Sequence, residues 1–342
     1  MGTSANAKIQ IETGQTLNAF AAMTDAGAHT VHTISGGTVW SGKSGYAPDV
    51  RPNGVVSGRN LGSPTSSEND KVDVADFTAY SKGVLKTVST STPASITRST
   101  SEGVSKVNSV TMTDAGVIAV VAGTQGATAA FSEVRDAAGG PPLIPADSVE
   151  LFQVRTTSSS AGEIDDDEIF QVDGTHFERF DSPTWEENNT GEGNAAATAG
   201  EKNAHIKFDS ALAASHTGPS AKKAYIKYYA PIMSDQSRAL NFTPVEKSHS
   251  ANSESFYGGS VASKSESLGQ GGFTALLNDG ITDSLVTNKN QVLTVKLYSD
   301  ENKAPYILSQ GAIALKRTYP EANQNKAVVT ITAEQESAEF SS

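Results

Sequence analysis

Residues Gln291 to Ala333 read QVLTVKLYSDENKAPYILSQGAIALKRTYPEANQNKAVVTITA, and this stretch decides the fold class of the chain. In its first eight residues, Leu293, Val295 and Leu297 alternate with side chains that are mostly polar or aromatic. A strand with one buried face and one exposed face has this period of two. We therefore expect a strand here, with Val295 on its buried side.

Two more strands are expected in the same stretch. Ser299 to Lys303 is a polar run that is typical of a turn. Tyr306 to Arg317 is the second strand candidate, in which Gly311 marks a bulge or a close approach of two backbones. Lys326 to Thr332 is the third, and its apolar side chains alternate in the same way. Three strands joined by short polar links predict an antiparallel meander.

The rest of the chain also favours strands. Val107 to Gly123 is the strongest hairpin pattern, with its turn at Asp114-Ala115-Gly116. Asp73 to Val88 fits a helix or a strand, and we favour a strand after Gly83; Gly271 to Asn278 is the most helix-like short piece. Other strand candidates are the segments 149–155, 168–172, 176–180, 204–208 and 224–231. The predicted fold class is mostly β, with one or two short helices and long loops.

Composition divides the chain into three parts. Residues 1–14 are polar, and we expect an extended N-terminal arm whose removal leaves the fold intact. Residues 15–103 form a β region rich in Gly, Ser and Thr. Residues 104–342 form the main β core, with loop insertions at 182–201 and 245–267, because both stretches are polar and carry few apolar side chains.

The overall composition excludes several classes of protein. The chain has 342 residues, no cysteine and a formal net charge of −12. Without cysteine there is no disulfide framework, thiolate metal site or cysteine nucleophile. The basic pairs Lys222-Lys223 and Lys316-Arg317 are too short to grip nucleic-acid phosphates. Met1 to Gln10 lacks the apolar region of a signal peptide, and no apolar run approaches the ~20 residues of a spanning helix, so we expect a soluble protein with no membrane partner.

No group of residues predicts catalysis. The chain has no Walker A loop, no G-x-S-x-G elbow and no H-E-x-x-H motif. His29 and His32 are three apart, so on a strand they would point to opposite faces and could not share a metal; we interpret both as surface residues. Glu163 to Glu168 (EIDDDE) is acidic but lacks the spacing of a calcium loop, and we interpret it as solvated. We predict no catalytic, cofactor-binding or metal-binding residue, and no cofactor.

The remaining polar and aromatic features have ordinary interpretations. The histidines at positions 176, 205, 216 and 249 are isolated in the sequence. Asn188 and Asn241 begin glycosylation sequons, which we interpret as chance matches because no secretory signal precedes them. Tyr225, Tyr228 and Tyr229 could stack on bases only in a basic setting, so we expect them to pack in the core or in an interface.

Several segments together resemble a known family. They are VLTVKLYSDENKAPYILSQGAIALKRTYP at 292–320, NKAVVTITAEQESAEF at 325–340, AAGGPPLIPADSVELFQVRTTS at 137–158, IFQVDGTHFERFDSPTWEENN at 169–189 and AYIKYY at 224–229. Over roughly Val104 to Phe340, this pattern of strands, turns and spacing resembles the major tail tube proteins of long-tailed bacteriophages. The first hundred or so residues carry no comparable resemblance.

The resemblance implies a structural protein of the virion, assembled in the host cytoplasm. It implies a β-sandwich or rolled sheet with a flanking helix, which completes a β-barrel when subunits, usually six, form a ring. Stacked rings would form a tail tube whose acidic lumen conducts double-stranded DNA without sequence-specific binding. The implied partners are further copies of the chain, the tape measure protein, the tail terminator and, where the tail contracts, a sheath protein. None of the family's residues is catalytic.

Two other classes of protein share this composition. One is another virion β protein, such as a capsid decoration protein or a carbohydrate-binding module, and a sugar binder would need clustered aromatic residues where this chain has only the tryptophans Trp40 and Trp185. The other is a β-helical or sandwich hydrolase, which would need two carboxylates at a fixed separation. The acidity of the chain favours the tube, because like charge keeps DNA from adhering to a conduit.

Overall fold

The C-terminal meander is present as predicted. β22 (Val292–Tyr298), β23 (Tyr306–Glu321) and β24 (Gln324–Thr332) pair consecutively in antiparallel order. Val295 is fully buried, as predicted, but Thr294 on the face expected to be exposed is fully buried as well, so β22 is covered on both sides. The alternation holds on β24, where Val329 is buried and Val328 is exposed. A Cβ atom on Gly311 would lie 2.6 Å from the carbonyl oxygen of Thr332, which confirms the close approach expected at this glycine.

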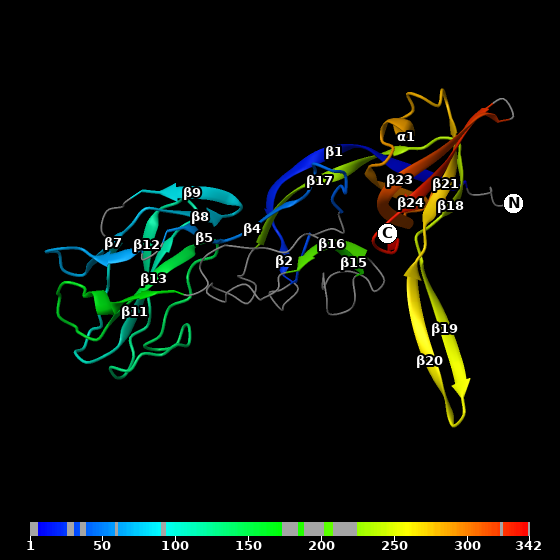
Figure 1. The fold of residues 1–342 in the computed structure, drawn as a ribbon. Coiled ribbons are helices and arrows are strands. Elements are labelled where there is room, and N and C mark those ends of the chain that lie inside the picture. Colours follow the sequence, from blue (N-terminus) through cyan, green and yellow to red (C-terminus); the bar gives the residue numbers. More distant parts are fainter. Residues whose placement is uncertain are drawn as a thin grey trace.

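The computed structural model describes residues 6–25, 31–34, 39–58, 61–89, 94–172, 184–187, 202–207, 224–321 and 324–340. The predictions at His29, His176 to Phe180, Asn188 and His216 lie outside these residues, as does most of the segment 182–201. Figure 1 shows two β lobes connected by extended strands, and a long hairpin that projects from the lobe holding the meander.

The meander lies inside a nine-stranded sheet with the order β18-β21-β24-β23-β22-β1-β17-β4, in which β25 also pairs with β23. Its other strands are β1 (Lys8–Ala22), β4 (Asp49–Pro52), β17 (Ala224–Asp235), β18 (Ala239–Thr243), β21 (Gly271–Leu277) and β25 (Ala338–Phe340). All of these strands pair in antiparallel fashion. This central sheet is therefore assembled from both ends of the chain.

The N-terminal arm is a wrong prediction from Lys8 onward. β1 begins at Lys8, pairs with β22 through Ile11 and then with β17 along most of its length. Ile9 and Ile11 are both buried, because in a strand they point to the same face while Lys8 and Gln10 point to the other. This alternation is short and lies within a polar segment, so it is easily missed in the sequence. Removing residues 1–14 would strip two isoleucines from the core, so the fold is not expected to survive that deletion.

The segment Gly271 to Asn278 is a strand, which corrects the helix expected there. Phe273, Ala275 and Leu277 are all buried, and this period of two belongs to a strand. Gly272 lies so close to β24 that a Cβ atom would meet the carbonyl oxygen of Val329 at 2.4 Å. The single α-helix of the described residues follows as α1 (Ser284–Thr287), and its Leu285 packs into the same core as Phe273.

The second lobe contains three smaller sheets around one core. Their orders are β5-β8-β9, β10-β7-β6 and β12-β11-β13-β14. The strands are β5 (Gly54–Ser57), β6 (Gly62–Pro64), β7 (Lys71–Val74), β8 (Phe77–Ser81), β9 (Val84–Val88), β10 (Ala94–Ser95), β11 (Lys106–Met112), β12 (Ile118–Ala122), β13 (Val149–Thr156) and β14 (Ile169–Gln171). The hairpin at Asp114-Ala115-Gly116 and the strand after Gly83 are confirmed.

The division expected at residue 103 runs through this second core. Val55, Val72 and Phe77 from before that point share one hydrophobic cluster with Val110 and Phe152 from after it. Residues 54–171 therefore form one lobe, inserted between β4 and β17 of the central sheet. We call it the inserted lobe. Composition does not reveal this arrangement because Gly, Ser and Thr are common on both sides of residue 103.

A small sheet lies between the two lobes in Figure 1. Its order is β15-β16-β3-β2, with β2 (Thr24–Asp25), β3 (Val31–Thr33), β15 (Thr184–Glu187) and β16 (Lys202–Lys207). A second hydrophobic cluster joins Ile206 of this sheet to Val50, Ile226 and Leu308 of the central sheet, together with Trp40. Trp40 is thus part of the core between these two sheets.

The segment 245–267 is not a loop. It forms two ten-residue strands, β19 (Lys247–Phe256) and β20 (Gly259–Leu268), which pair only with each other. Across the described residues, the fold is mostly β, with one short α-helix and one short 3₁₀-helix, η1 (Asp166–Glu168). The sheets are open in this single chain and are not closed into a barrel.

Replacement of Val295 by Asp is expected to unfold the central sheet. The side chain is fully buried in the core shared with Phe273 and Leu285, and burying an unpaired carboxylate there costs several kcal/mol, roughly 3 or more. Circular dichroism during heating checks this. The matched control is Val328→Asp on the exposed side of β24, which should change stability little; a Val295→Asp protein as stable as this control would contradict the assigned face.

Candidate assembly surfaces

The β19–β20 hairpin has no core of its own. Every side chain of its two strands is exposed, apart from the half-buried Leu268 at its base. Hydroxyl pairs cross the hairpin on one face, Ser248 with Ser267 at 2.8 Å and Ser250 with Ser265 at 2.6 Å. An isolated two-stranded hairpin is marginally stable in water at best. A hairpin of this length therefore needs a surface to lie against.

The tip of the hairpin is its apolar part. Phe256 and Val261 are largely exposed, and Tyr257 is 106% exposed. Gly258 adopts φ +99°, which an L side chain rarely takes, so the tight turn depends on this glycine. At the base, the Lys247–Glu266 ion pair at 2.7 Å and the Gly269 N–H, which donates to the Glu246 carbonyl at 2.9 Å, hold the two strands together. The Lys247 N–H also donates to the Glu336 carboxylate at 3.4 Å, which connects the base to the segment after β24. The hairpin thus presents aromatic side chains at the end that lies away from this connection.

The edges of the central sheet are a second surface for association. β18 and β4 are its terminal strands, and β1 from Thr13 onward pairs with β17 but with no other described strand. Leu17 on β1, Ile232 on β17 and Leu240 on β18 are exposed apolar side chains. Edge strands carry backbone groups that can pair with another chain. The central sheet therefore has both edge strands and exposed apolar side chains through which another chain could bind.

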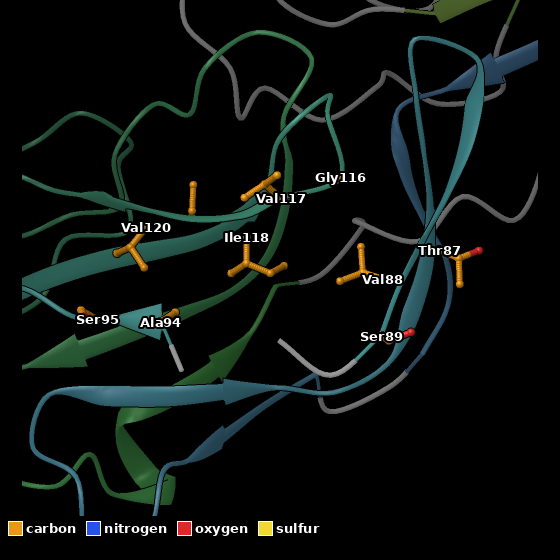
Figure 2. A pocket seen from close by; sticks show the side chains of 10 residues that line it. Thr87, Val88, Ser89, Ala94, Ser95, Gly116, Val117, Ile118 and Val120 are labelled. Atoms are coloured by element: carbon orange, nitrogen blue, oxygen red, sulfur yellow. The ribbon is translucent and has the colours of Figure 1, made fainter. Parts of the chain in front are cut away.

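The inserted lobe carries an open groove. The groove lies between β12 and the ends of β9 and β10, with a volume of about 700 Å³. Figure 2 shows Val88, Ile118 and Val120 directed toward the space between these strands, with Val117 beside the turn at Gly116. It is lined by aliphatic and hydroxyl side chains and holds no carboxylate, imidazole or ammonium group. This lining suits contact with apolar groups and offers nothing for acid–base chemistry.

A polar contact joins the inserted lobe to the central sheet. The Tyr225 hydroxyl on β17 donates a hydrogen bond to the Asp147 carboxylate, which lies just before β13. Asn53 donates to the same carboxylate at 3.4 Å. Burial and the negative charge of Asp147 raise the pKa of the Tyr225 hydroxyl well above its usual value of 10.0. Phe20 of β1 adds an apolar contact, because it lies directly against Gly83.

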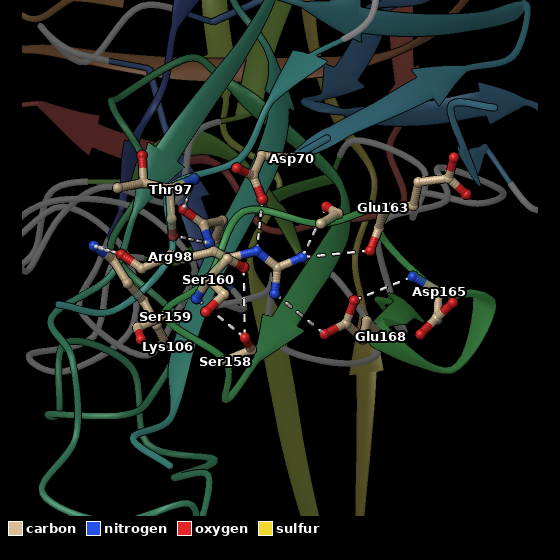
Figure 3. A network of polar contacts seen from close by, with 12 residues as sticks. Asp70, Thr97, Arg98, Lys106, Ser158, Ser159, Ser160, Glu163, Asp165 and Glu168 are labelled. Atoms are coloured by element: carbon tan, nitrogen blue, oxygen red, sulfur yellow. Dashed lines mark hydrogen bonds and ion pairs between the residues drawn. The ribbon is translucent and has the colours of Figure 1, made fainter. Parts of the chain in front are cut away.

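An arginine organises the polar end of the inserted lobe (Figure 3). Arg98 donates to the Asp70 carboxylate at 2.5 Å and to the Gly162 carbonyl at 3.1 Å, and its guanidinium lies 3.8 Å from the Glu168 carboxylate. Glu168 also accepts the Asp165 N–H at 3.1 Å. The acidic run 163–168 is therefore folded into a short 3₁₀-turn held by an arginine, and Ile164 within it is buried. The carboxylates at positions 163, 165, 166 and 167 are exposed, as expected of a solvated run.

The histidines are placed differently from one another. His32 is fully buried in β3, so its interpretation as a surface residue is wrong, while His249 is exposed on the hairpin. His205 lies on β16. Among the described residues, no three His, Cys, Asp or Glu side chains form a group that could hold a metal ion. In the part of the chain that the structure describes, no helix is long and apolar enough to cross a membrane.

The tyrosines predicted to pack do so. Tyr225 and Tyr228 are buried, and Tyr229 meets Tyr46 edge to face with ring centroids 5.0 Å apart. Tyr46 thereby holds its loop against β17. Sequence reasoning missed the hairpin, because its strands are rich in Ser and Ala and poor in β-branched residues. The signal was the alternation of serines on either side of Tyr257-Gly258.

Comparison with known protein families, with curated proteins and with solved structures gives no match for this chain.

Replacement of Tyr225 by Phe tests the contact between the lobes. Loss of the hydroxyl leaves Asp147 with fewer donors and should lower the free energy of unfolding by about 1–3 kcal/mol near neutral pH. Because the pKa of Tyr225 is raised on folding, the unfolded chain ionises first, and this contribution is lost as the pH rises above about 10. Chemical denaturation at pH 7 and pH 11 measures both effects. Equal stability differences at the two pH values would contradict this assignment.

Proposed function

We propose that this chain is a structural, self-assembling subunit of a bacteriophage tail tube. The observation that carries the proposal is the β19–β20 hairpin, two ten-residue strands without a core that pair only with each other. A chain that keeps such a hairpin must bury it against another surface, and further copies of the same chain supply one in any concentrated assembly. In this proposal, the function of the chain is to build the wall of the assembled tube.

The central sheet supports the same proposal. It is open, it curves around the short helix α1, and both of its terminal strands are available for pairing. Unpaired edge strands promote aggregation of a monomer, but in a ring of subunits they can pair with the edge strands of the neighbouring copies. A closed barrel is then a property of the ring, with the rolled sheet and flanking helix as the contribution of each subunit. Stacked rings, most simply hexameric, form the tube.

The charge of the chain suits a conduit for double-stranded DNA. The net charge is −12, and Lys and Arg side chains that could grip phosphates are scattered among more numerous carboxylates. Proteins that neutralise phosphates bind DNA tightly, whereas a surface of like charge lets it slide. In this proposal the chain resides in the virion, and its partners are other copies, the tape measure protein, the tail terminator and, in a contractile tail, a sheath protein.

A carbohydrate-binding role is less well supported. Trp40 is buried in the core between the central sheet and the small sheet, so its ring is not available to stack on a sugar. The exposed aromatic side chains Phe256 and Tyr257 are at the end of the β19–β20 hairpin, next to its turn. We therefore keep the assembly role as the conclusion.

Electron microscopy of the intact protein tests the proposal directly. We expect rings with a central opening, and stacks of rings at higher protein concentration, because every copy carries the same unpaired edges and hairpin. Sedimentation velocity over a concentration series gives the same information in solution. A protein that remains a monomer at all concentrations would contradict the proposal.

Shortening the hairpin should separate folding from assembly. Replacing residues 249–266 by an Asn-Gly turn keeps the Ser248–Ser267 pair and the Gly269–Glu246 hydrogen bond at the base, and it removes only exposed side chains, so the melting temperature should stay within a few degrees of the original. Assembly into stacked rings should be lost. The matched control is Val134→Ser, an exposed apolar residue of the inserted lobe, which should assemble normally. Tubes of ordinary length from the shortened chain would contradict the role of the hairpin.

A further inference from the structure

The groove of the inserted lobe is bordered by the edges of three different sheets. β9 ends the sheet β5-β8-β9, β10 ends β10-β7-β6, and β12 ends β12-β11-β13-β14. The residues that face the groove include Val88, Ile118 and Val120, and Val117 at its rim is 60% exposed. The site therefore combines aliphatic side chains with strand edges, which is what an incoming β segment with apolar side chains can use.

The hairpin tip has the complementary properties. Phe256, Tyr257 and Val261 are its exposed apolar side chains, and they are carried on a strand pair that can present a free edge. Glu254 is exposed two residues before Phe256, whereas Lys86 lies beside Gly116 at the rim of the groove. The two surfaces therefore match in apolar character. The groove rim also carries Asp114, which pairs with Lys82, so Lys82 and Lys86 outnumber one carboxylate there and face the single acidic Glu254 beside the tip.

We infer that the hairpin tip of one copy docks in the inserted-lobe groove of a second copy. This inference rests on the proposed function, because it names the contact that a self-assembling chain would use. In Figure 1 the hairpin projects from the lobe that holds the meander, well away from β9 and β12 of the same chain. Each copy thus offers one tip and one groove, and a contact between unlike surfaces propagates into a ring or a filament.

The size of the contact defines its role. Two aromatic side chains bury roughly 300–500 Å² together, and a groove of about 700 Å³ has room for both rings. A stable interface buries about 800 Å² on each partner. Tip docking therefore acts together with the pairing of sheet edges and selects which neighbour is engaged, since only a copy that presents its groove at the correct position can accept the tip.

Cysteine cross-linking tests the contact without background, because the chain contains no cysteine. One preparation carries Tyr257→Cys and a second carries Val117→Cys; both positions are exposed, so neither change should disturb folding. The two are mixed under assembly conditions, treated with a mild oxidant and digested for mass spectrometry. A third preparation, Val134→Cys, places an equally exposed thiol elsewhere on the same lobe.

The expected result is a disulfide between positions 257 and 117 in the assembled fraction, and little between 257 and 134. In parallel, the double variant Phe256→Ser with Tyr257→Ser should raise the protein concentration needed for half-assembly about tenfold or more. Assemblies in which position 257 links to 134 as readily as to 117, or never to 117, would overturn the docking inference and leave the proposed function standing. A protein that does not assemble at all in sedimentation overturns both.

Discussion

The pairing of β1 with β22 is the constraint on which the central sheet depends. Four consecutive residues of β1, from Lys8 to Ile11, meet the strand that begins the C-terminal meander. Directly after them, the buried Glu12 accepts the Thr294 N–H at 3.0 Å across 282 positions of sequence, and it accepts the Ser41 hydroxyl at 2.5 Å. A buried carboxylate is tolerated only when such donors surround it. This seam fixes the register of both chain ends at once.

Because this pairing joins the two ends of the chain, the segments between β1 and β22 begin and end at the central sheet. The inserted lobe leaves after β4 and returns before β17, which are neighbours in that sheet. Its own core is complete, and its described contacts with the sheet include the Tyr225–Asp147 hydrogen bond and Phe20 against Gly83. In the proposed assembly, two separately cored lobes with contacts of this kind would let the inserted lobe serve as a binding unit carried by the sheet.

The sequence predicted the parts of the fold in which apolar side chains report directly on burial. Val295 and Val329 are buried as their period of two predicts, and the Val107 to Gly123 hairpin pairs as predicted, although β11 is buried on both faces. The helix expected at Gly271 to Asn278 was an error of period, because alternate residues of that segment are buried. Two other errors arose where pairing, and not burial, decides the structure. The hairpin strands have no buried face, so no pattern of hydrophobicity could mark them. The seam at Lys8 to Ile11 joins segments nearly a whole chain apart, and the pairing of distant strands is not written in either segment alone.

The sequence predicted no catalytic or binding residue, and the proposed function rests on surfaces instead. In the proposed assembly, a net charge of −12 makes copies of this chain repel one another, so association would draw on interactions that carry no net charge. Backbone pairing at open sheet edges and contact through the exposed aromatic hairpin tip would be of this kind. Both would also be directional, because an edge has a register and the tip has one proposed groove. Repulsion over the whole surface, opposed by attraction at a few fixed points, favours one ordered arrangement over nonspecific aggregation. That balance is what a subunit needs if it must remain dispersed until it meets the growing end of an assembly.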